Sequence, residues 1–428
     1  MLLQVVVLLG GMVVLMLTGL PVFFGMVLSV FVYWALFPGV LPGFVIGQSF
    51  VQGIDSYSFA AIPFFFLAGE IMNAGGLSLR LLRLAQALVG HVRGGLSHVN
   101  ILANMVMAGV SGSAAADASA IGSVLAPAMK REGYGAAYAA AVTASASTIG
   151  PMIPPSIPLV IYGLISGASI GKLFLAGVVP GLLMGVFLLV ASAIISSRRR
   201  YPKSAWGGWA RVGKSLLESV AALIMPVLVV SGLVGGIATT SEIGAFAVAY
   251  AVVVSMFVYR ELTWAALWQV VCKAARDASV VLIIASVAGA FTWIIANLGV
   301  GRVLAAAIGG LTTDPRAVLL IICVVLLIAG TVLEPVTTLL VLIPLFIPLC
   351  ARVGIDLVHF GVVTVLATLI GMCTPPVGFL IYLTAAQAQA DIVDVTRELL
   401  PFILALVLLL IALALVPGLA LWLPAALM

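Results

Sequence analysis

Long apolar runs separated by short polar segments make up most of the chain. A run of about 20 apolar residues is long enough to cross the hydrocarbon layer of a bilayer as an α-helix. The pattern therefore predicts an all-α polytopic membrane protein, since a membrane β-barrel would show alternating segments of about 10 residues. The predicted spans are residues 2–20, 23–37, 57–74, 136–165, 174–195, 218–237, 241–258, 277–298, 357–388 and 398–416.

Two further apolar stretches, 98–128 and 316–352, are too long for one span and carry small or polar residues at their middle. Those residues read GVSGSAAADAS in the first stretch and AGTVLEPVTT in the second. Each stretch predicts a re-entrant hairpin, in which two half-length helices enter and leave the membrane on one side. Backbone of this kind is tolerated at membrane depth where protein or a water-filled cavity surrounds it.

Composition supports the membrane assignment, because 64% of the 428 residues are hydrophobic and 8% are charged, against about 25% charged residues in soluble domains. The first span has no Lys or Arg before it and no small-residue cleavage site after it, which favours a retained helix over a signal peptide. The net charge of +5 does not indicate nucleic-acid binding, since the distribution of positive charge matters more in a membrane protein. The lipid bilayer is the expected surrounding, and no organic cofactor is expected.

The distribution of Lys and Arg predicts an orientation. If RRRYPK at 198–203 is cytoplasmic, counting spans outward places fifteen of the 19 basic residues on that side. The four left outside are Lys172, Arg302, Arg316 and Arg352. This is a strong positive-inside bias. Both termini are then expected outside, with the first hairpin open toward the cytoplasm and the second toward the other face.

The two halves of the chain repeat one order of motifs. DASAIGSVLAP begins at Asp117 and EPVTTLLVLIP begins at Glu334, each with a proline ten residues after the acid. IGPMIPPS at 149–156 is matched by IGMCTPPV at 370–377, each with Ile-Gly followed by Pro-Pro. Proline removes a backbone donor and disfavours a helical residue before it, so both segments predict a broken helix.

An odd number of spans in each half inverts the second half relative to the first. The first repeat is predicted over 1–195 and the second over 217–428, and the basic, Trp-bearing 196–216 is expected to connect them as a cytoplasmic amphipathic segment on the membrane surface. Interrupted apolar segments at matching places in two inverted halves are the best sequence indicator of a secondary transporter's binding site. The alternative, that the Gly/Pro clusters are simple kinks, is disfavoured by the matched double prolines.

Each hairpin tip and each break exposes two kinds of backbone group. The end of one half-helix presents carbonyls, and the start of the next presents free N–H groups. Carbonyls and hydroxyls suit Na⁺, whereas N–H groups suit a carboxylate. The Na⁺-binding residues predicted in this way are Ser111, Gly112, Ser113, Ser147, Ile149, Gly150 and Pro154 in the first half, and Gly330, Thr331, Glu334, Thr368, Gly371, Met372 and Thr374 in the second.

Several roles stay open at this point. Ser and Gly at the first tip are also ordinary turn residues. Asp117 and Glu334 either cap a hairpin helix or take part in an ion site. Glu70 and Asn73 contact neighbouring helices, another subunit or the cargo. No Lys or Arg lies in the tip-and-break region, so a carboxylate would rely on N–H groups, hydroxyls and bound cations unless an arginine arrives from elsewhere. The residues predicted to hold the substrate are Ser113, Ala114, Pro155, Ser156, Thr337 and Pro376.

Four long motifs carry a family resemblance: IPFFFLAGEIMNAGG, GVSGSAAADASAIGSVLAPAM, TIGPMIPPSIPLVIYG and GMCTPPVGFLIYL. Together they resemble the large membrane subunit of the tripartite ATP-independent periplasmic (TRAP) transporters, over essentially the whole chain. The resemblance implies an elevator-type transporter, in which hairpins and broken helices move against a scaffold. It also implies Na⁺-driven import of an organic acid across the bacterial inner membrane, so that the termini predicted outside from the charge distribution would be periplasmic. A Na⁺ site between each tip and its break is implied as well.

The same resemblance implies two partners, a separate small four-helix membrane subunit and a periplasmic substrate-binding protein. Glu334 stands where aspartate is equally expected, and Met372 and Cys373 replace small polar residues in the second break. A stand-alone Na⁺/dicarboxylate symporter of the divalent-anion type is the alternative within transporters, and it would need no binding protein. An intramembrane enzyme would use Asp117 and Glu334 as an acid pair, but no nucleophile motif accompanies them. We therefore expect a transporter subunit and not an enzyme.

Overall fold

The computed structural model describes residues 2–38 and 42–428, and every regular element within them is helical. The first half contains α1 (Leu2–Val5), η1 (Val6–Gly10), α2 (Gly11–Leu17), α3 (Val22–Leu36), α4 (Gly43–Gln52), η2 (Tyr57–Ala60), α5 (Ala61–Ala74), α6 (Leu77–Val89), α7 (Gly95–Ser111), α8 (Ala114–Arg131), α9 (Ala136–Ser147), α10 (Ile157–Ser166) and α11 (Ile170–Arg198). The second half contains α12 (Gly208–Val234), α13 (Thr240–Val252), η3 (Val253–Val258), α14 (Trp264–Leu298), α15 (Val300–Leu311), α16 (Pro315–Gly330), α17 (Pro335–Val353), α18 (Leu357–Gly371), α19 (Phe379–Ala388), α20 (Ile392–Leu415) and α21 (Gly418–Leu427). The prediction of an all-α protein is confirmed.

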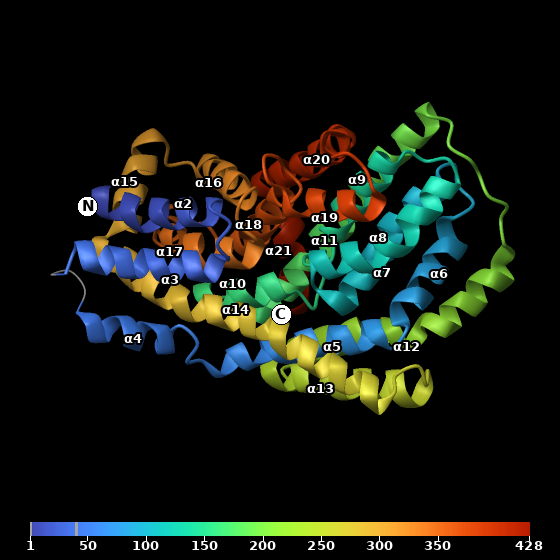
Figure 1. The fold of residues 1–428 in the computed structure, drawn as a ribbon, viewed down its shortest axis with the longest axis horizontal. Coiled ribbons are helices and arrows are strands. Elements are labelled where there is room, and N and C mark those ends of the chain that lie inside the picture. Colours follow the sequence, from blue (N-terminus) through green and yellow to red (C-terminus); the bar gives the residue numbers. More distant parts are fainter. Residues whose placement is uncertain (1, 39–41) are drawn as a thin grey trace.

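Two groups of packed helices position the site, and the remaining helices pack around them (Figure 1). The arm helices are α4, α5, α12, α13 and α14, and among them α5 packs on both α13 and α14. The hairpin core comprises α7 to α10 and α16 to α19. In this core α9 packs on α8 and α19, α16 packs on α18, and α10 packs on α17. Elements from the two halves of the sequence therefore share one interior.

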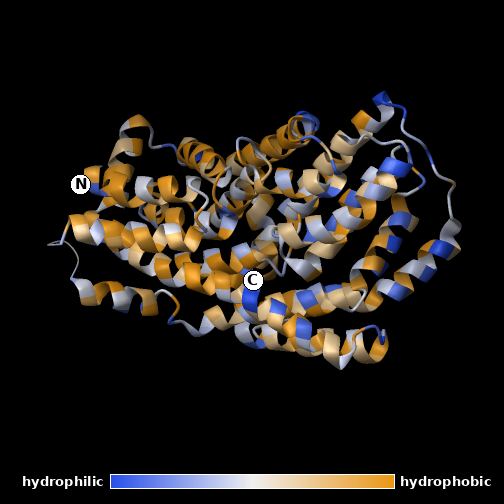
Figure 2. Ribbon diagram, viewed as in Figure 1, coloured by the Kyte–Doolittle hydropathy of each residue, from blue (hydrophilic) through white to orange (hydrophobic). Residues whose placement is uncertain are grey.

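Seven helices of the described residues are long and apolar enough to cross a membrane. They are Tyr57–Ala74, Ile170–Arg198, Gly208–Val234, Thr240–Val258, Trp264–Leu298, Pro335–Val353 and Ile392–Leu415. Figure 2 shows hydrophobic residues along most of the helices and hydrophilic residues gathered over α6 and the adjoining end of α12. The structure is therefore that of a multi-pass membrane protein.

Both predicted hairpins are pairs of helices joined by a short connection. α7 ends at Ser111 because Gly112 takes a left-handed conformation with φ of +61°, which glycine adopts without steric penalty. Ser113 then starts α8, and its hydroxyl accepts from the Ala116 N–H at 3.4 Å. The second pair, α16 and α17, is joined by residues 331–334. That these pairs are re-entrant in a membrane stays a prediction.

Both predicted breaks interrupt a helix. The first stops α9 and restarts the chain as α10, which leaves 148–156 without helix, and the second leaves 372–378 without helix between α18 and α19. Ser156 begins α10 by accepting from the Leu159 N–H at 3.2 Å, while its own hydroxyl donates to the Pro151 carbonyl. A serine thus satisfies one free donor and one free acceptor of the first break.

Several boundaries differ from the predicted ones. α14 begins at Trp264 and not at 277, and α20 begins at Ile392 and not at 398. α12 begins at Gly208, so 208–216 of the predicted connector continue directly into the next long helix, and 199–207 alone link it to α11. Charged residues in the N-terminal parts of these helices, such as Lys273 and Arg276 in α14, lower the local hydropathy and hide these parts from a search for apolar runs. α4, α6, α15 and α21 lie outside the predicted spans because each is short.

Candidate functional site

Both hairpin tips and both breaks line one cavity of about 450 Å³. The start of α8 and the start of α17 also open on it, and a helix start carries partial positive charge. From these segments the wall includes Gly112, Ser113, Ala114, Pro151, Gly330, Thr331, Glu334 and Met372. Segments that are far apart in the sequence therefore meet at one place, and the two tip-and-break pairs predicted separately share one cavity.

The first tip packs against the first break through backbone atoms. A Cβ placed on Gly112 would lie 2.5 Å from the Pro155 carbonyl oxygen, so no side chain fits between the two segments. The Ser111 hydroxyl accepts from the Ser113 N–H at 3.2 Å. The close approach of Gly112 to Pro155 places the flanking residues Ser111 and Ser113 next to the first break.

Asp117 carries a fully buried carboxylate in the first turn of α8. Its Oδ2 lies against Gly150 of the first break, in the space that a side chain at Gly150 would occupy. Neither carboxylate oxygen has a hydrogen-bond partner among the described residues. Ser113, and not Asp117, supplies the side-chain cap of α8. Because an unpaired buried carboxylate is strongly unfavourable, this arrangement is suited to holding a cation between α8 and the break.

The second tip and break are closed by their own backbone. A Cβ placed on Gly371 would lie 2.6 Å from Gly330 Cα. The Gly378 N–H donates to the Thr331 carbonyl at 3.0 Å. The Glu334 carboxylate accepts from the Thr337 hydroxyl at 3.3 Å. The second acid therefore has a protein partner, unlike Asp117.

Four other hydroxyls predicted for the ion sites donate to carbonyls of their own helices. They are Ser147, Thr331, Thr368 and Thr374, each 2.8 or 2.9 Å from its acceptor. A hydroxyl that donates in this way keeps its oxygen lone pairs for a further partner. Ile149 and Pro154 are buried within the first break, and the Pro154 carbonyl oxygen would lie 3.7 Å from a Cβ on Gly109 of α7.

The residues predicted for the substrate are divided by the structure. Ser113 and Ala114 line the cavity. Ser156 uses its hydroxyl at the start of α10, and Pro155 is buried against the first tip. Thr337 is buried inside α17 and Pro376 is exposed. Of the six residues, only Ser113 and Ala114 belong to the wall of this cavity.

A second cavity of about 770 Å³ adjoins the first, between the first hairpin and the arm helices α5 and α14. Ser113 and Glu334 line both cavities. Phe66 of α5 and Val281 of α14 also line both. The arm helices thus complete a wall that the tip and break motifs leave open.

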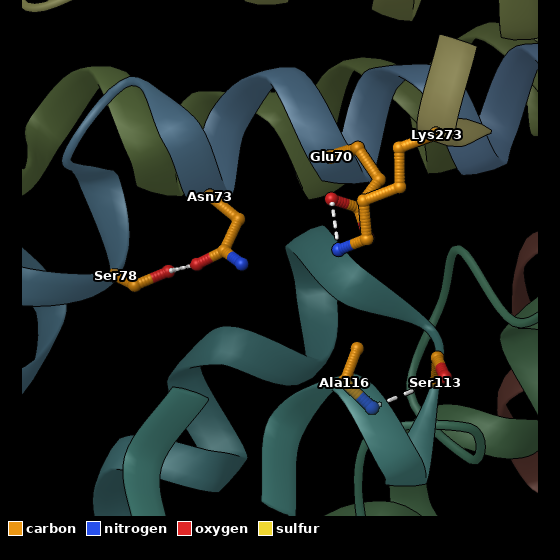
Figure 3. A network of polar contacts seen from close by, with 6 residues as sticks. All are labelled: Glu70, Asn73, Ser78, Ser113, Ala116 and Lys273. Atoms are coloured by element: carbon orange, nitrogen blue, oxygen red, sulfur yellow. Dashed lines mark hydrogen bonds and ion pairs between the residues drawn. The ribbon is translucent and has the colours of Figure 1, made fainter. Parts of the chain in front are cut away.

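Glu70 and Asn73, whose partners were open, contact residues of this chain (Figure 3). The Lys273 Nζ of α14 donates to the two Glu70 carboxylate oxygens at 2.9 and 2.8 Å. The Asn73 Oδ1 accepts from the Ser78 hydroxyl at 2.7 Å. Lys273 is a basic group that reaches the site from outside the tips and breaks.

The family described as "Tripartite ATP-independent periplasmic transporter, DctM component" matches residues 9–419. The chain belongs to this family. It is 37% identical over 414 residues to the "2,3-diketo-L-gulonate TRAP transporter large permease protein YiaN" of Escherichia coli, with 96% of each chain covered. It is 36% identical over 414 residues to the "Sialic acid TRAP transporter large permease protein SiaM" of Vibrio cholerae, with 97% of each covered.

A third relative is longer than this chain. The "Isethionate TRAP transporter permease protein DctMQ" of Oleidesulfovibrio alaskensis is 38% identical over 418 residues, which cover 96% of this chain and 65% of that protein. The solved YdaH transporter of Alcanivorax borkumensis matches 89% of each chain with a TM-score of 0.61 and 16% sequence identity. At that identity the likeness concerns the fold alone. The predicted TRAP resemblance is confirmed, and the family is one of transporters.

On the arm-side wall of this TRAP large permease, Glu70 and Asn73 were candidates from the sequence, whereas the two charged residues of α14 were missed. Lys273 and Asp277 both line the larger cavity. They are four residues apart, so they lie on one face of α14. Charged residues on one face of an otherwise apolar helix are functional candidates, and this signal is present in the sequence.

Proposed function

We propose that this TRAP large permease imports a small organic acid together with Na⁺. The observation that supports the proposal is the cavity of about 450 Å³ at which both tips and both breaks meet. Carbonyl ends and hydroxyls suit Na⁺, and helix starts suit a carboxylate. The two cargoes would then lie beside each other, so that binding of one favours binding of the other.

The first Na⁺ site would lie between the first tip and the first break. Asp117 supplies a buried carboxylate without a protein partner, and Gly150 supplies backbone next to it. Ser111 and Ser113 add hydroxyls from the tip. Oxygen atoms alone make up this set, which suits a small hard cation.

The second Na⁺ site would use the matching segments of the second half. Thr331 and Glu334 lie at the tip beside the cavity, and Gly330 packs directly on Gly371 of the break. The Thr374 hydroxyl donates to the Ile370 carbonyl at 2.8 Å, so its oxygen stays available as an acceptor.

In our proposal the hairpin core moves as an elevator along the arm helices. The same order of hairpin and break in two halves of predicted inverted topology supports this reading, because inverted repeats commonly provide two alternative, related arrangements. At one point the arm helix α5 and the core helix α7 contact each other without an intervening side chain. A Cβ on Gly69 of α5 would lie 3.0 Å from the Val110 carbonyl oxygen of α7, so a glycine allows close approach there.

The proposal includes two partner proteins, a small four-helix membrane subunit and a periplasmic binding protein that delivers the acid. The word tripartite in the family description supports a three-part assembly, and the DctMQ relative extends well beyond the part that this chain matches. The relatives' names refer to diketogulonate, sialic acid and isethionate, which are all small organic acids. The bias of Lys and Arg supports an inner-membrane orientation with both termini periplasmic.

Transport by proteoliposomes that contain the permease and its small subunit tests the proposal. Uptake of radiolabelled acid is measured with an inward Na⁺ gradient, with K⁺ in place of Na⁺, and with or without the binding protein. The test panel is 2,3-diketo-L-gulonate, N-acetylneuraminate, isethionate and succinate. We expect uptake of at least one acid that requires both Na⁺ and the binding protein.

Two results would contradict the proposal in different ways. Uptake at full rate without the binding protein would favour the stand-alone Na⁺/dicarboxylate symporter. Uptake that is unchanged when K⁺ replaces Na⁺ would remove the coupling ion and, with it, the role given to Asp117.

A further inference from the structure

The cavity of about 770 Å³ extends from the first hairpin tip along α8, in the direction of the helix end that carries Lys130 and Arg131. Its wall follows α8 from Ser113 at the tip to Ala120, about two helical turns farther on. α8 ends in Lys130 and Arg131, and basic residues collect on the cytoplasmic side of a membrane. In the proposed orientation the cavity lies on the cytoplasmic side of the tips, on the route by which a transported acid would leave.

Lys273 is the one basic residue that lines either cavity within residues 2–38 and 42–428. Its Nζ is bound to Glu70, but 58% of the Lys273 side chain is exposed, against 14% of the Glu70 side chain. Both residues line the cavity, the Glu70 carboxylate is the less exposed partner, and the two side chains point toward each other (Figure 3). Exposed ion pairs contribute little free energy because water competes for both charges, so another carboxylate is able to replace Glu70.

The pair lies next to the first tip. Gly69 precedes Glu70 in α5, and a Cβ on Gly69 would lie 3.0 Å from the Val110 carbonyl oxygen and 3.4 Å from the Ser111 carbonyl oxygen. Glu70 is therefore one residue from the contact between α5 and the end of α7. A carboxylate that leaves Ser113 meets Lys273 as the first full positive charge on this route.

We propose that Lys273 binds the carboxylate of the departing acid on the cytoplasmic side of the tips, in exchange for Glu70. This assignment rests on the proposed function, which supplies the organic acid and its direction. Glu70, Asp117, Asp277 and Glu334 line the same cavity, so it also suits Na⁺ that leaves by this route. A departing Na⁺ neutralises Glu70 while the acid occupies Lys273, and each cargo then has a partner of opposite charge.

Counterflow in proteoliposomes tests this contact from the inside. Liposomes that contain the permease and its small subunit are loaded with unlabelled acid at varied concentration, and they take up the labelled acid delivered by the binding protein. The acids are 2,3-diketo-L-gulonate, N-acetylneuraminate, isethionate and succinate, each tested separately. The measured quantity is the internal concentration that gives half-maximal counterflow.

Lys273→Gln is expected to raise this concentration about tenfold, the effect of losing one charge-assisted hydrogen bond of moderate strength. Glu70→Gln is expected to lower it severalfold, because it removes the competitor for Lys273. Lys273→Arg keeps the charge and should stay near the parent value. Arg276→Gln is the matched control, since Arg276 is exposed on the same helix and lines neither cavity.

The opposite directions of Lys273→Gln and Glu70→Gln separate an anion contact from a purely structural pair. If both variants shift the internal half-saturating concentration in one direction, or only lower the melting temperature, the pair merely joins α5 to α14 and the proposal is wrong. The Na⁺ concentration for half-maximal transport is measured in parallel and should not change in Lys273→Gln. If the parent complex transports none of the four acids, or transports them without Na⁺, the proposed function is wrong, and the role of Lys273 is wrong with it.

Discussion

The two tip-and-break units have the same order of elements but satisfy their polar groups differently. In the first, the buried Asp117 carboxylate faces Gly150 and has no hydrogen-bond partner among the described residues. In the second, Glu334 accepts from the Thr337 hydroxyl, and tip and break are joined by a direct backbone hydrogen bond. The first unit therefore leaves a buried carboxylate without a hydrogen-bond partner within 3.5 Å in the described part of the chain, whereas the second pairs its acid with a hydroxyl and joins tip to break through the backbone.

This difference implies a division of roles. A site that leaves a charge unpaired loses stability when empty and gains it when a cation binds. A site closed by backbone contacts depends instead on how closely its two segments approach, as Gly330 and Gly371 do. We therefore expect ion binding to depend on side-chain charge in the first unit and on backbone fit in the second.

The largest expected effect is that of Asp117→Asn. Removing the carboxylate removes the charge that a cation would neutralise, so Na⁺-driven uptake should fall more than about a hundredfold, the scale of breaking a buried charge pair. In buffer without Na⁺ the variant should melt at a higher temperature than the parent, because an unpaired buried charge has been removed. Uptake into proteoliposomes measures the first effect, and thermal unfolding with and without Na⁺ measures the second.

Glu334→Gln is the matched comparison in the second unit. It should reduce uptake less than Asp117→Asn and leave part of the Na⁺-dependent rise in melting temperature, because Glu334 has a protein partner. Equal losses in the two variants would contradict the division of roles. If the Asp117→Asn variant has a lower melting temperature than the parent in buffer without Na⁺, the Asp117 carboxylate has a stabilising partner in the Na⁺-free protein.

The parts of this site that could be predicted from sequence are those that local chemistry specifies. The double prolines of each break and the Gly112–Ser113 connection determine where helices stop and restart, because proline and left-handed glycine act on their own neighbours. The pairing of each tip with its break followed from the repeated motif order. Backbone closure at Gly330 and Gly371 did not follow from it, since the motif does not specify how closely two helices approach.

The arm-side walls could not be predicted in the same way. Phe66 and Val281 reach the cavities through the packing of α5 and α14 against the hairpin core, and apolar residues on long apolar helices look alike in sequence. Lys273 was passed over for a different reason. It lies in the first part of α14, which its own charge and those of its neighbours exclude from a span defined by hydropathy.

A smaller effect is expected from Gly371→Ala. The added Cβ would lie 2.6 Å from Gly330 Cα, and backbone atoms cannot move aside as a flexible side chain does. Overpacking of this kind destabilises by about 1–3 kcal/mol, so we expect a lower melting temperature and a Na⁺ half-activation concentration raised about tenfold. Gly213→Ala in α12 is the matched control, because a Cβ there meets nothing within 4 Å and alanine favours a helix. A Gly371→Ala variant as stable and as sensitive to Na⁺ as this control would show that the second unit does not depend on close backbone contact.

The smallest expected effects distinguish the two tip hydroxyls. The Ser113 oxygen accepts from the Ala116 N–H and lines both cavities, so Ser113→Ala removes a helix cap worth about 1 kcal/mol as well as one oxygen of the proposed first Na⁺ site. We expect the Na⁺ concentration for half-maximal uptake to rise severalfold, with assembly with the small subunit unchanged. Thr331→Val should shift it less, because the Thr331 carbonyl, which contacts the second break, is retained. An unchanged Na⁺ activation curve in Ser113→Ala would mean that the Ser113 hydroxyl does not bind Na⁺. A larger shift in Thr331→Val than in Ser113→Ala would mean that the second unit, and not the first, depends on its side chains.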